Sequence, residues 1–437
     1  MRYLSTHQRI WQLSFPLIIS NLSVPLLGMV DTAVMGRLDH PAFIGAIALG
    51  GVIFSFLYWG FGFLRMGTSG LTAQALGGER YGEIRLVLAR AIVLALLLAA
   101  LLILLRQPIA DLAFQWIHAS QSAESLAYRY YEIRIFSAPA TLLNYVLIGW
   151  FIGLQNTKIP LFLTVLANLT NIVLDIVFVL HWQWQVAGVA AASVTAEYSS
   201  LLCGLVFAAR KLRYFPTAFD WRQLISWAGF RPLIAINFNL FIRTLLLIFS
   251  FAFFTAQSAR LGDVILAANT VLLNFQSLMA YVLDGFAHAC EALVGKFHGA
   301  GNVRKLRQTV IAAAQWSLGG AILFCIAYIF AGDRLIALMT TQMAVRETAK
   351  SYQLFVALLP LISVWSFLFD GVFVGLTRAR EMRNAIFLSV LLGYLPVWWW
   401  LRDLGNDGLW IAFTTFMTLR SLLMGLYWKK MLKDWNW

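Results

Sequence analysis

Charged residues are scarce in this sequence. They make up 12% of the 437 residues, while hydrophobic residues make up 60% and the mean hydropathy is +0.75. Soluble domains carry about 25% charged residues, so this composition excludes a soluble globular fold. What the chain has instead is a series of apolar stretches of about 20 residues, which is the length that crosses a bilayer.

Cysteine and enzyme signatures are also sparse. The three cysteines lie far apart in apolar stretches without metal-ligand spacing, and we interpret them as packing residues: Cys203, Cys290 and Cys325. No GxGD or HExxH motif occurs in an apolar stretch, and His288 and His298 beside Glu291 lack zinc-ligand spacing. We therefore expect no enzyme, no cofactor and no metal other than a coupling Na⁺.

The apolar stretches predict an all-α integral membrane protein with twelve transmembrane helices. The first is too long, and too closely followed by others, to be a cleaved signal peptide. The predicted spans are 11–36, 46–71, 86–105, 131–154, 160–180, 186–209, 232–256, 265–294, 310–330, 352–376, 385–401 and 408–428.

The net charge of +13 is explained by topology. If the N-terminus is cytoplasmic, the predicted inner segments hold 20 of the 33 Lys and Arg residues and the outer segments hold 7. Cytoplasmic loops of membrane proteins carry such an excess. We therefore expect both termini in the cytoplasm, a location in the bacterial inner membrane, and no nucleic-acid partner.

An internal repeat divides the chain into halves. A shift of 222 positions places FIGL at Phe151 on FVGL at Phe373, and the segment 71–77 on 293–299. Six spans per half is an even number, so the halves are parallel repeats. We predict two pseudo-symmetric six-helix lobes, 1–215 and 216–437, joined by a cytoplasmic linker at about 210–231 that rests on lipid headgroups.

A polar stripe runs along the fifth predicted span. Thr164, Asn168, Asn171 and Asp175 are spaced by 4, 3 and 4 residues, which places them on one helical face. Thr164 and Asn168, together with Asn21 of the first span, are assigned to the wall of a substrate pocket.

Two acids and a hydroxyl lie at similar depth near the outer surface. Counted from the span ends at about 1.5 Å per residue, Asp31, Asp175 and Ser193 lie roughly 8, 9 and 11 Å deep. With Asn171 they offer oxygen ligands for Na⁺, and the paired carboxyls equally suit a proton. The alternative is that both aspartates are rim residues that reach outer water.

Other ionisable residues also lie within predicted spans. Arg243 and Asp284 are each 11 residues from the inner ends of neighbouring spans, so we predict a structural ion pair between them, with a coupling role as the alternative. Four residues have no assigned partner: Arg65, Glu197, Glu291 and Asp370.

Two prolines interrupt the first span. Pro16 and Pro25 each remove a backbone hydrogen bond. They predict either a fixed kink or a hinge whose shape depends on the protonation of Asp31.

Four motifs in the first half resemble the multidrug and toxic compound extrusion (MATE) family, in particular its bacterial DinF branch. They are VPLLGMVDTAVMGRLD from Val24, FLRMGTSGLTAQALG from Phe63, GWFIGLQNTKIP from Gly149 and NIVLDIVFVL from Asn171. In the second half, YVLDGFAHACEA from Tyr281 and FDGVFVGLTRAREMRN from Phe369 extend the resemblance over the whole chain.

The resemblance implies a V-shaped pair of lobes that exports amphipathic, often cationic compounds in exchange for H⁺ or Na⁺. It implies a coupling site at Asp31 and Asp175 with Asn171 and Ser193, and a substrate-facing amide at Asn144. A second family asparagine is replaced here by Tyr145, so drug preference is open. We expect a monomer whose partners are small-molecule drugs or toxins and membrane lipids. The alternative within the superfamily is a flippase for lipids or lipid-linked compounds.

Overall fold

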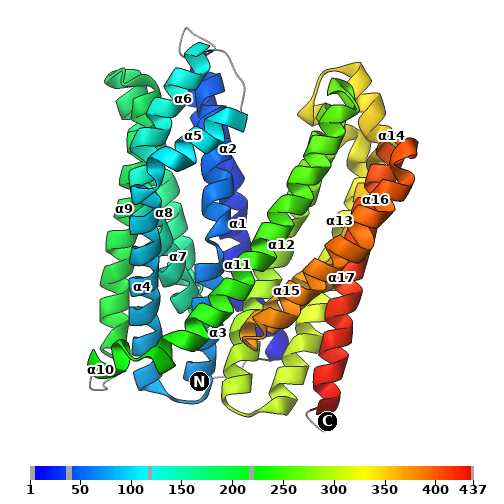
Figure 1. Cartoon of the computed structure of the whole chain (residues 1–437). Coiled ribbons are helices and arrows are strands. Elements are labelled where there is room, and N and C mark those ends of the chain that lie inside the picture. The colour runs from blue at the N-terminus through cyan, green and yellow to red at the C-terminus, as the bar shows by residue number, and fades with distance from the viewer. Residues whose placement is uncertain (1–4, 36–41, 117–120, 216–220, 435–437) are drawn as a thin grey trace. The chain divides into compact units, whose positions relative to one another are not determined.

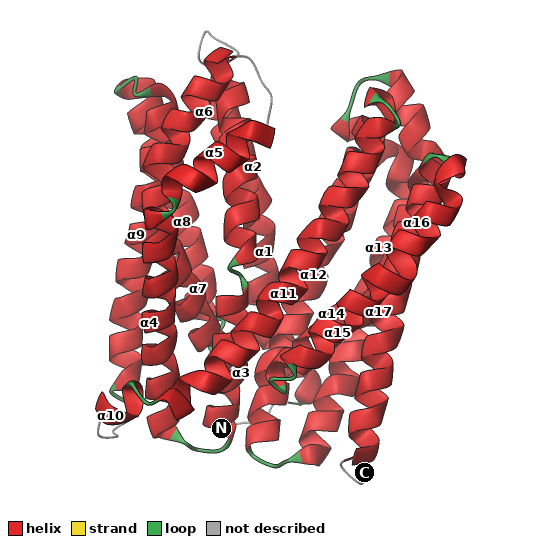
Figure 2. Ribbon diagram, viewed as in Figure 1, coloured by secondary structure: helices red, strands yellow, loops and turns green. Residues whose placement is uncertain are grey.

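The computed structural model describes residues 5–35, 42–116, 121–215 and 221–434, which form helices and turns without strands (Figure 2). Within these residues, twelve helical stretches are long and apolar enough to cross a membrane by length and composition. The predicted all-α class with twelve membrane helices is confirmed. The helices extend further than hydropathy indicates. For example, α6 begins at Gln121, whereas the fourth predicted span begins at Tyr131.

The chain folds as two compact units. One contains Ile19–Ile234, and the other contains Met1–Ile18 with Ala235–Trp437. These boundaries differ from the predicted division between residues 215 and 216, because the start of the first helix belongs to the unit formed by the second half of the chain. Within that unit the start of α1 (Thr6–Met35) and the end of α17 (Asn406–Asp434) lie at the same end (Figure 1).

Aromatic packing explains why the first turns of α1 belong with the second half. The Trp11 ring lies edge-on to Phe286 and Trp316, with ring centroids 5.5 and 5.1 Å apart. About two turns further on, Ile18 fills the space beside Gly285, where a Cβ atom would collide with the Ile18 side chain. The change of unit after Ile18 therefore falls inside a continuous helix.

The unit Ile19–Ile234 contains the remainder of α1 and the helices that follow it (Figure 1). A short turn at Phe61 and Gly62 divides the second predicted span into two helices, and α5 was not predicted. The elements are α2 (Ala42–Gly60), α3 (Phe63–Gly77), α4 (Tyr81–Leu104), α5 (Arg106–Trp116), α6 (Gln121–Arg134), the 3-10 turn η1 (Ile135–Ser137), α7 (Ala138–Gly153), α8 (Lys158–Asp175), the π-helical turn η2 (Ile176–His181), α9 (Gln185–Leu212) and α10 (Trp221–Leu224).

The other unit is built from longer helices around a core rich in aromatic residues. Its first helix, α11 (Trp227–Arg260), begins in the preceding unit. The other elements are α12 (Asp263–Gly299), α13 (Val303–Met339), α14 (Met343–Gly375), α15 (Ala379–Leu388), the π-helical turn η3 (Ser389–Tyr394), α16 (Leu395–Leu401), the 3-10 turn η4 (Arg402–Leu404) and α17.

Glycines four residues apart allow one close helix pair in each unit. A Cβ atom at Gly153 of α7 would lie 2.7 Å from the Ser69 carbonyl oxygen of α3, and one at Gly375 of α14 would lie 2.6 Å from the Glu291 carbonyl oxygen of α12. One turn earlier, Gly149 and Gly371 make the equivalent contacts with the backbone of two residues, Arg65 and Ala287. The contacts of the first unit are related to those of the second by a shift of 222 positions. Small residues at a helix interface let the two backbones approach closely.

The helix ends repeat as well. Gln155 after α7 and Thr377 after α14 both have positive φ, 58° and 56°. In both places the third residue beyond the helix closes the turn, with the Asn156 amide 2.9 Å from the Phe151 carbonyl oxygen and the Arg378 amide 2.8 Å from that of Phe373. The two FIGL and FVGL motifs therefore end their helices in the same way.

The predicted linker is anchored by α4. Arg90 donates to the carbonyl oxygen of Gln223 at 2.5 Å, at the C-terminal end of α10, and lies 6.0 Å from the Phe230 ring centroid. Ile225 and Trp227, which follow α10, remain 77% and 69% exposed. The linker residues 216–220 lie outside the described residues.

Candidate functional site

The polar stripe of α8 faces α1. Thr164 Oγ1 accepts a hydrogen bond from Ser20 Oγ at 2.8 Å, and Asn168 Nδ2 donates to Ser23 Oγ at 3.0 Å. Neither serine was predicted as part of the site, although both lie three residues apart on the same helix as Asp31. Thr164 and Asn168 thus join two helices, and their assignment with Asn21 to a substrate pocket stays a prediction.

At the outer end of this stripe the structure brings together the four residues of the predicted cation site. With its amide nitrogen turned toward the acids, Asn171 donates to Asp31 Oδ1 at 3.1 Å and to Asp175 Oδ2 at 3.0 Å. Its amide oxygen then accepts from the Ser193 amide and hydroxyl, both at 3.1 Å. This orientation leaves no acceptor facing an acceptor, whereas the opposite one turns the amide oxygen toward both carboxyls.

Both carboxyls are shielded from solvent. Asp31 is 8% exposed and Asp175 is fully buried, so water at the membrane rim does not solvate them. Both carboxyls accept from the same Asn171 amide nitrogen, which places the two acids next to each other. Asp175 Oδ1 has no hydrogen-bond partner among the described residues. Two adjacent buried negative charges would be costly, so the pair suits a bound proton or another cation.

Arg134 is a positively charged residue that interacts with these acids, and it was not predicted as part of the site. It interacts electrostatically with Asp31, Asp175 and Glu197. Its guanidinium lies 5.4 Å from the Phe54 ring centroid and makes a similar contact with Tyr130. It ends α6, where the helix tightens into η1. A single arginine after an aromatic-rich stretch is not a distinctive sequence pattern, so the sequence did not identify Arg134 as part of the site.

Asn144, which the resemblance assigns to the substrate side, holds a third acid. Its amide nitrogen donates to Glu197 Oε2 at 2.8 Å and to the Glu197 carbonyl oxygen at 3.0 Å. Glu197 lies on α9 one turn beyond Ser193 and is partly exposed. It therefore has a partner that the sequence did not indicate.

The two prolines lie in a continuous α1, with Pro16 buried and Pro25 exposed. The change of unit after Ile18 falls between them. The helix is therefore unbroken in the segment where the sequence predicted a hinge or a kink. Within that segment α1 passes from one compact unit to the other.

A different buried ion cluster occupies the other unit, and it gives Arg243 a partner that the sequence did not predict. Arg243 Nη2 and Arg420 Nη2 both donate to Asp370 Oδ2, the latter at 2.5 Å. The three side chains are at most 8% exposed. Asp284 interacts electrostatically with Arg420, and its predicted pairing with Arg243 stays a prediction. Counting residues from span ends gives depth but not direction around the helix, which is why Asp370 was not predicted as a partner of Arg243.

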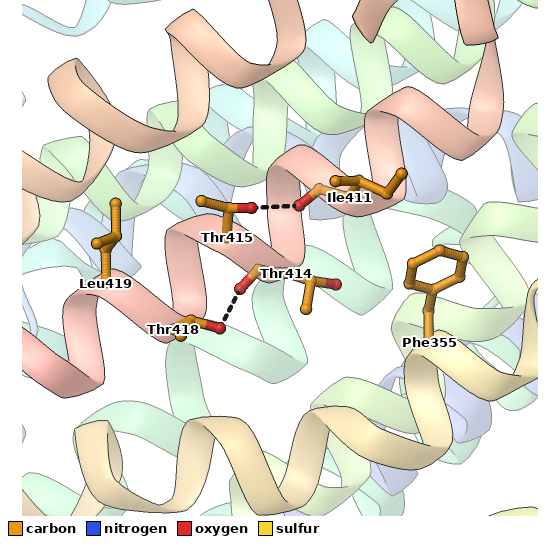
Figure 3. Close-up of a pocket in the computed structure, with 6 residues that line it drawn as sticks. All are labelled: Phe355, Ile411, Thr414, Thr415, Thr418 and Leu419. Atoms are coloured by element: carbon orange, nitrogen blue, oxygen red, sulfur yellow. Dashed lines mark hydrogen bonds between the residues drawn. The ribbon is translucent and has the colours of Figure 1, made fainter.

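A pocket of about 260 Å³ lies between α14 and α17 of this second unit (Figure 3). Thr415 and Thr418 line it, but both hydroxyls donate to carbonyl oxygens of their own helix at 2.8 Å. Its lining contains no titratable group. Within the described ranges, no group of three or more His, Cys, Asp or Glu residues could hold a metal ion.

Comparison with known proteins agrees with this architecture. The MatE family model matches residues 16–177 and 240–399. The chain is 41% identical over 434 residues to DNA damage-inducible protein F of Escherichia coli, covering 99% of this chain and 94% of that protein. It is 24% identical over 355 residues to a Bacillus cereus protein named "Probable multidrug resistance protein NorM", covering 79% and 77%.

Solved structures share the fold. A MOP superfamily transporter from Pyrococcus furiosus superposes with a TM-score of 0.90 at 18% identity, covering 99% of this chain and 97% of that one. The family match spans both repeats, and the Escherichia coli relative spans nearly the whole chain. Together with twelve membrane-length helices, these matches show that the chain belongs to the MatE family, whose members are transporters and not enzymes.

Proposed function

We propose that this protein is an efflux antiporter that exports small amphipathic cationic compounds in exchange for H⁺, with Na⁺ as the alternative coupling ion. Family membership and the multidrug resistance name of the Bacillus relatives support the substrate class. The observation that carries the proposal is the buried Asp31–Asn171–Asp175 cluster, because two buried carboxyls bridged by an uncharged amide need a positive ion to offset their negative charge.

The geometry of Asn171 favours H⁺ over Na⁺. When its amide nitrogen faces the acids, its oxygen is occupied by Ser193, so the amide offers no ligand to a metal cation. Sodium binding requires the amide to turn over and expose oxygen to the site. Proton binding requires no such change, because the Asn171 amide nitrogen already bridges the two carboxyls.

Proton uptake removes negative charge from the space between α1, α8 and α9. In the proposed cycle this change alters α1 in the segment between Pro16 and Pro25, where the helix passes from one unit to the other. One proton crossing a potential of 100 mV supplies about 2.3 kcal/mol.

The test is transport of ethidium by the purified chain in liposomes, with proton and sodium gradients imposed separately. We expect a proton gradient to drive dye movement, and Asp31→Asn and Asp175→Asn to reduce it to the level of empty liposomes while folding is retained. Asp111→Asn, which changes an exposed aspartate on α5, is the matched control and should transport normally.

Two results would change the proposal. Full proton-driven transport by Asp31→Asn would remove this acid from the coupling step, and a response to sodium alone would select Na⁺. Dye movement under neither gradient would favour the flippase alternative. Arg243 and Arg420, which the alternative needs as a basic surface, are paired with Asp370.

A further inference from the structure

The chain that joins α9 to α11 is strongly basic. Its described parts, 210–215 and 222–231, hold five basic residues and no acid. Asp220, between them, is the one acid of the linker, so five positive charges and one negative charge leave +4 over residues 210–231. All five basic residues are at least partly exposed: Arg210, Lys211, Arg213, Arg222 and Arg231.

Large apolar side chains of the same parts are exposed. Tyr214, Ile225 and Trp227 are 76%, 77% and 69% exposed. Their neighbour Phe215 is only 6% exposed, because it stacks on Tyr81 of α4 with ring centroids 5.5 Å apart. The linker therefore packs on its own unit with some apolar side chains and presents others outward. Exposed apolar groups beside polar ones are typical of a surface that contacts a membrane or another molecule.

Arg90 of α4 fixes the backbone that carries these outward side chains. Its Nη2 atom donates to the Gln223 carbonyl oxygen at 2.5 Å, and its Nε atom donates to the Leu224 carbonyl oxygen at 3.4 Å. The guanidinium also occupies the space beside Gly229, where an added Cβ atom would collide with it. The backbone is thus held both before and after Ile225.

Positive charge and aromatic rings lie together on this surface. Lys211 Nζ is 5.3 Å from the Tyr214 ring centroid and 5.9 Å from that of Phe215. In Figure 1, α10 lies beside the end of α9. Segments at a membrane surface combine the two in this way, since aromatic rings enter the headgroup layer while cations meet the phosphates.

Two partners match a basic surface, an anionic lipid headgroup and an acidic protein. Position favours the lipid. The linker begins and ends at candidate membrane spans, Gln185–Leu212 and Arg222–Arg260, so headgroups lie within its reach without any further binding partner. The exposed apolar side chains also suit a headgroup layer, which covers an apolar interior.

We propose that these exposed side chains form a binding surface for the phosphate headgroups of anionic phospholipids, and that Arg90 is its positioning residue. The linker surface consists of the five basic residues together with Tyr214, Ile225 and Trp227. A basic residue beside an anionic membrane surface favours binding roughly fivefold. This inference does not depend on whether the protein exports drugs.

The test is binding of phosphatidylglycerol with a fluorescent acyl chain to the full-length protein in neutral detergent, compared with phosphatidylcholine carrying the same chain. We expect phosphatidylglycerol to bind at least tenfold more tightly. In the triple variant Arg210→Gln, Lys211→Gln, Arg213→Gln the preference should fall below threefold. Equal affinity of the unmodified protein for the two lipids would overturn the proposal and favour an acidic protein partner.

The matched control removes the same charge from exposed positions of α13 in the other unit, through Arg304→Gln, Lys305→Gln and Arg307→Gln together. This variant should keep its preference within twofold of the unmodified protein. Equal losses in the two triple variants would show that total charge selects the lipid, which would overturn the linker surface. Thermal unfolding and gel filtration check that both variants fold.

Two single substitutions separate the parts of the surface. Arg90→Gln keeps all five exposed basic residues but releases α10, so the preference for phosphatidylglycerol should fall about threefold. An unchanged preference would refute the positioning role. Trp227→Ser removes an apolar contact and should weaken binding of both lipids by the same factor, about threefold. No effect on either lipid would remove Trp227 from the surface.

Free phosphate carries the same chemistry as a headgroup phosphate, so it is tested as a competitor. Added salt should weaken phosphatidylglycerol binding by screening. At matched ionic strength, inorganic phosphate should displace the lipid no more than sodium chloride does. Stronger displacement by phosphate would identify a site for the free anion and overturn the lipid assignment.

Discussion

At the scale of single residues, the two buried acid clusters differ in what neutralises them. Asp370 lies against two arginines that are part of the chain, so its charge is permanently compensated. Asp31 and Asp175 are bridged instead by an amide, which carries no charge. Only the second arrangement therefore leaves a role for a positive ion that binds and dissociates.

The Asp370 cluster should therefore act mainly in stability. Asp370→Asn leaves two buried guanidiniums uncompensated, and breaking such a pair costs about 3–5 kcal/mol. Thermal unfolding of the purified protein should show a large decrease in midpoint. Asp333→Asn, which breaks the exposed Lys350–Asp333 pair, should cost about 0–1 kcal/mol. Equal effects of the two substitutions would contradict a structural role for Asp370.

At the scale of elements, sequence patterns predicted which segments are helical better than how the helices meet. Hydropathy located the membrane spans, since about 20 apolar residues in a row have few alternatives. It missed the turn at Gly62 that separates α2 from α3, and the short helix α5, because neither interrupts or adds a long apolar run. The glycine contacts between α3 and α7 were visible only as a repeated motif, FIGL and FVGL.

Those glycines give a prediction about helix packing. Gly371→Ala would push a methyl group into the Ala287 backbone of α12, and overpacking of this kind costs roughly 1–3 kcal/mol. Gly149→Ala should act alike through the Arg65 backbone. Yield and thermal stability in detergent measure the effect.

Open glycines provide the controls for these substitutions. Gly319 of α13 and Gly51 of α2 have no atom within 4 Å of an added Cβ, so alanine there should be tolerated. Equal stability of the Gly371→Ala and Gly319→Ala variants would show that α12 and α14 can separate without cost.

At the scale of the whole molecule, the backbone repeats but the chemistry does not. The glycine contacts and the left-handed helix ends recur at 222 positions. The acids do not, since Asp31 and Asp175 correspond to Phe253 and Val397, while Asp370 corresponds to Ile148. We infer that duplication supplied the scaffold and that each unit then acquired a different polar cluster.

The charge distribution predicts the orientation of the whole chain. A cysteine introduced as Lys430→Cys, near the C-terminus, should react with a membrane-impermeant maleimide only after the membrane is opened, because basic segments stay in the cytoplasm. Arg334→Cys, in an outer segment by the same count, should react in intact cells. Both positions are exposed, so access depends on the side of the membrane. Labelling of both in intact cells would place the C-terminus outside.

The sequence by itself determined the class of protein, the number of membrane spans, the repeat and the identity of the four residues at the candidate cation site. These follow from composition, from spacing along a helix and from depth counted from the span ends, which are local properties. Only the tertiary structure decided the partners: Asp370 for Arg243, Asn144 for Glu197, and the Asn171 amide for both aspartates. Depth in a membrane can be counted along the chain, but the direction in which a side chain points toward another helix depends on how those helices pack.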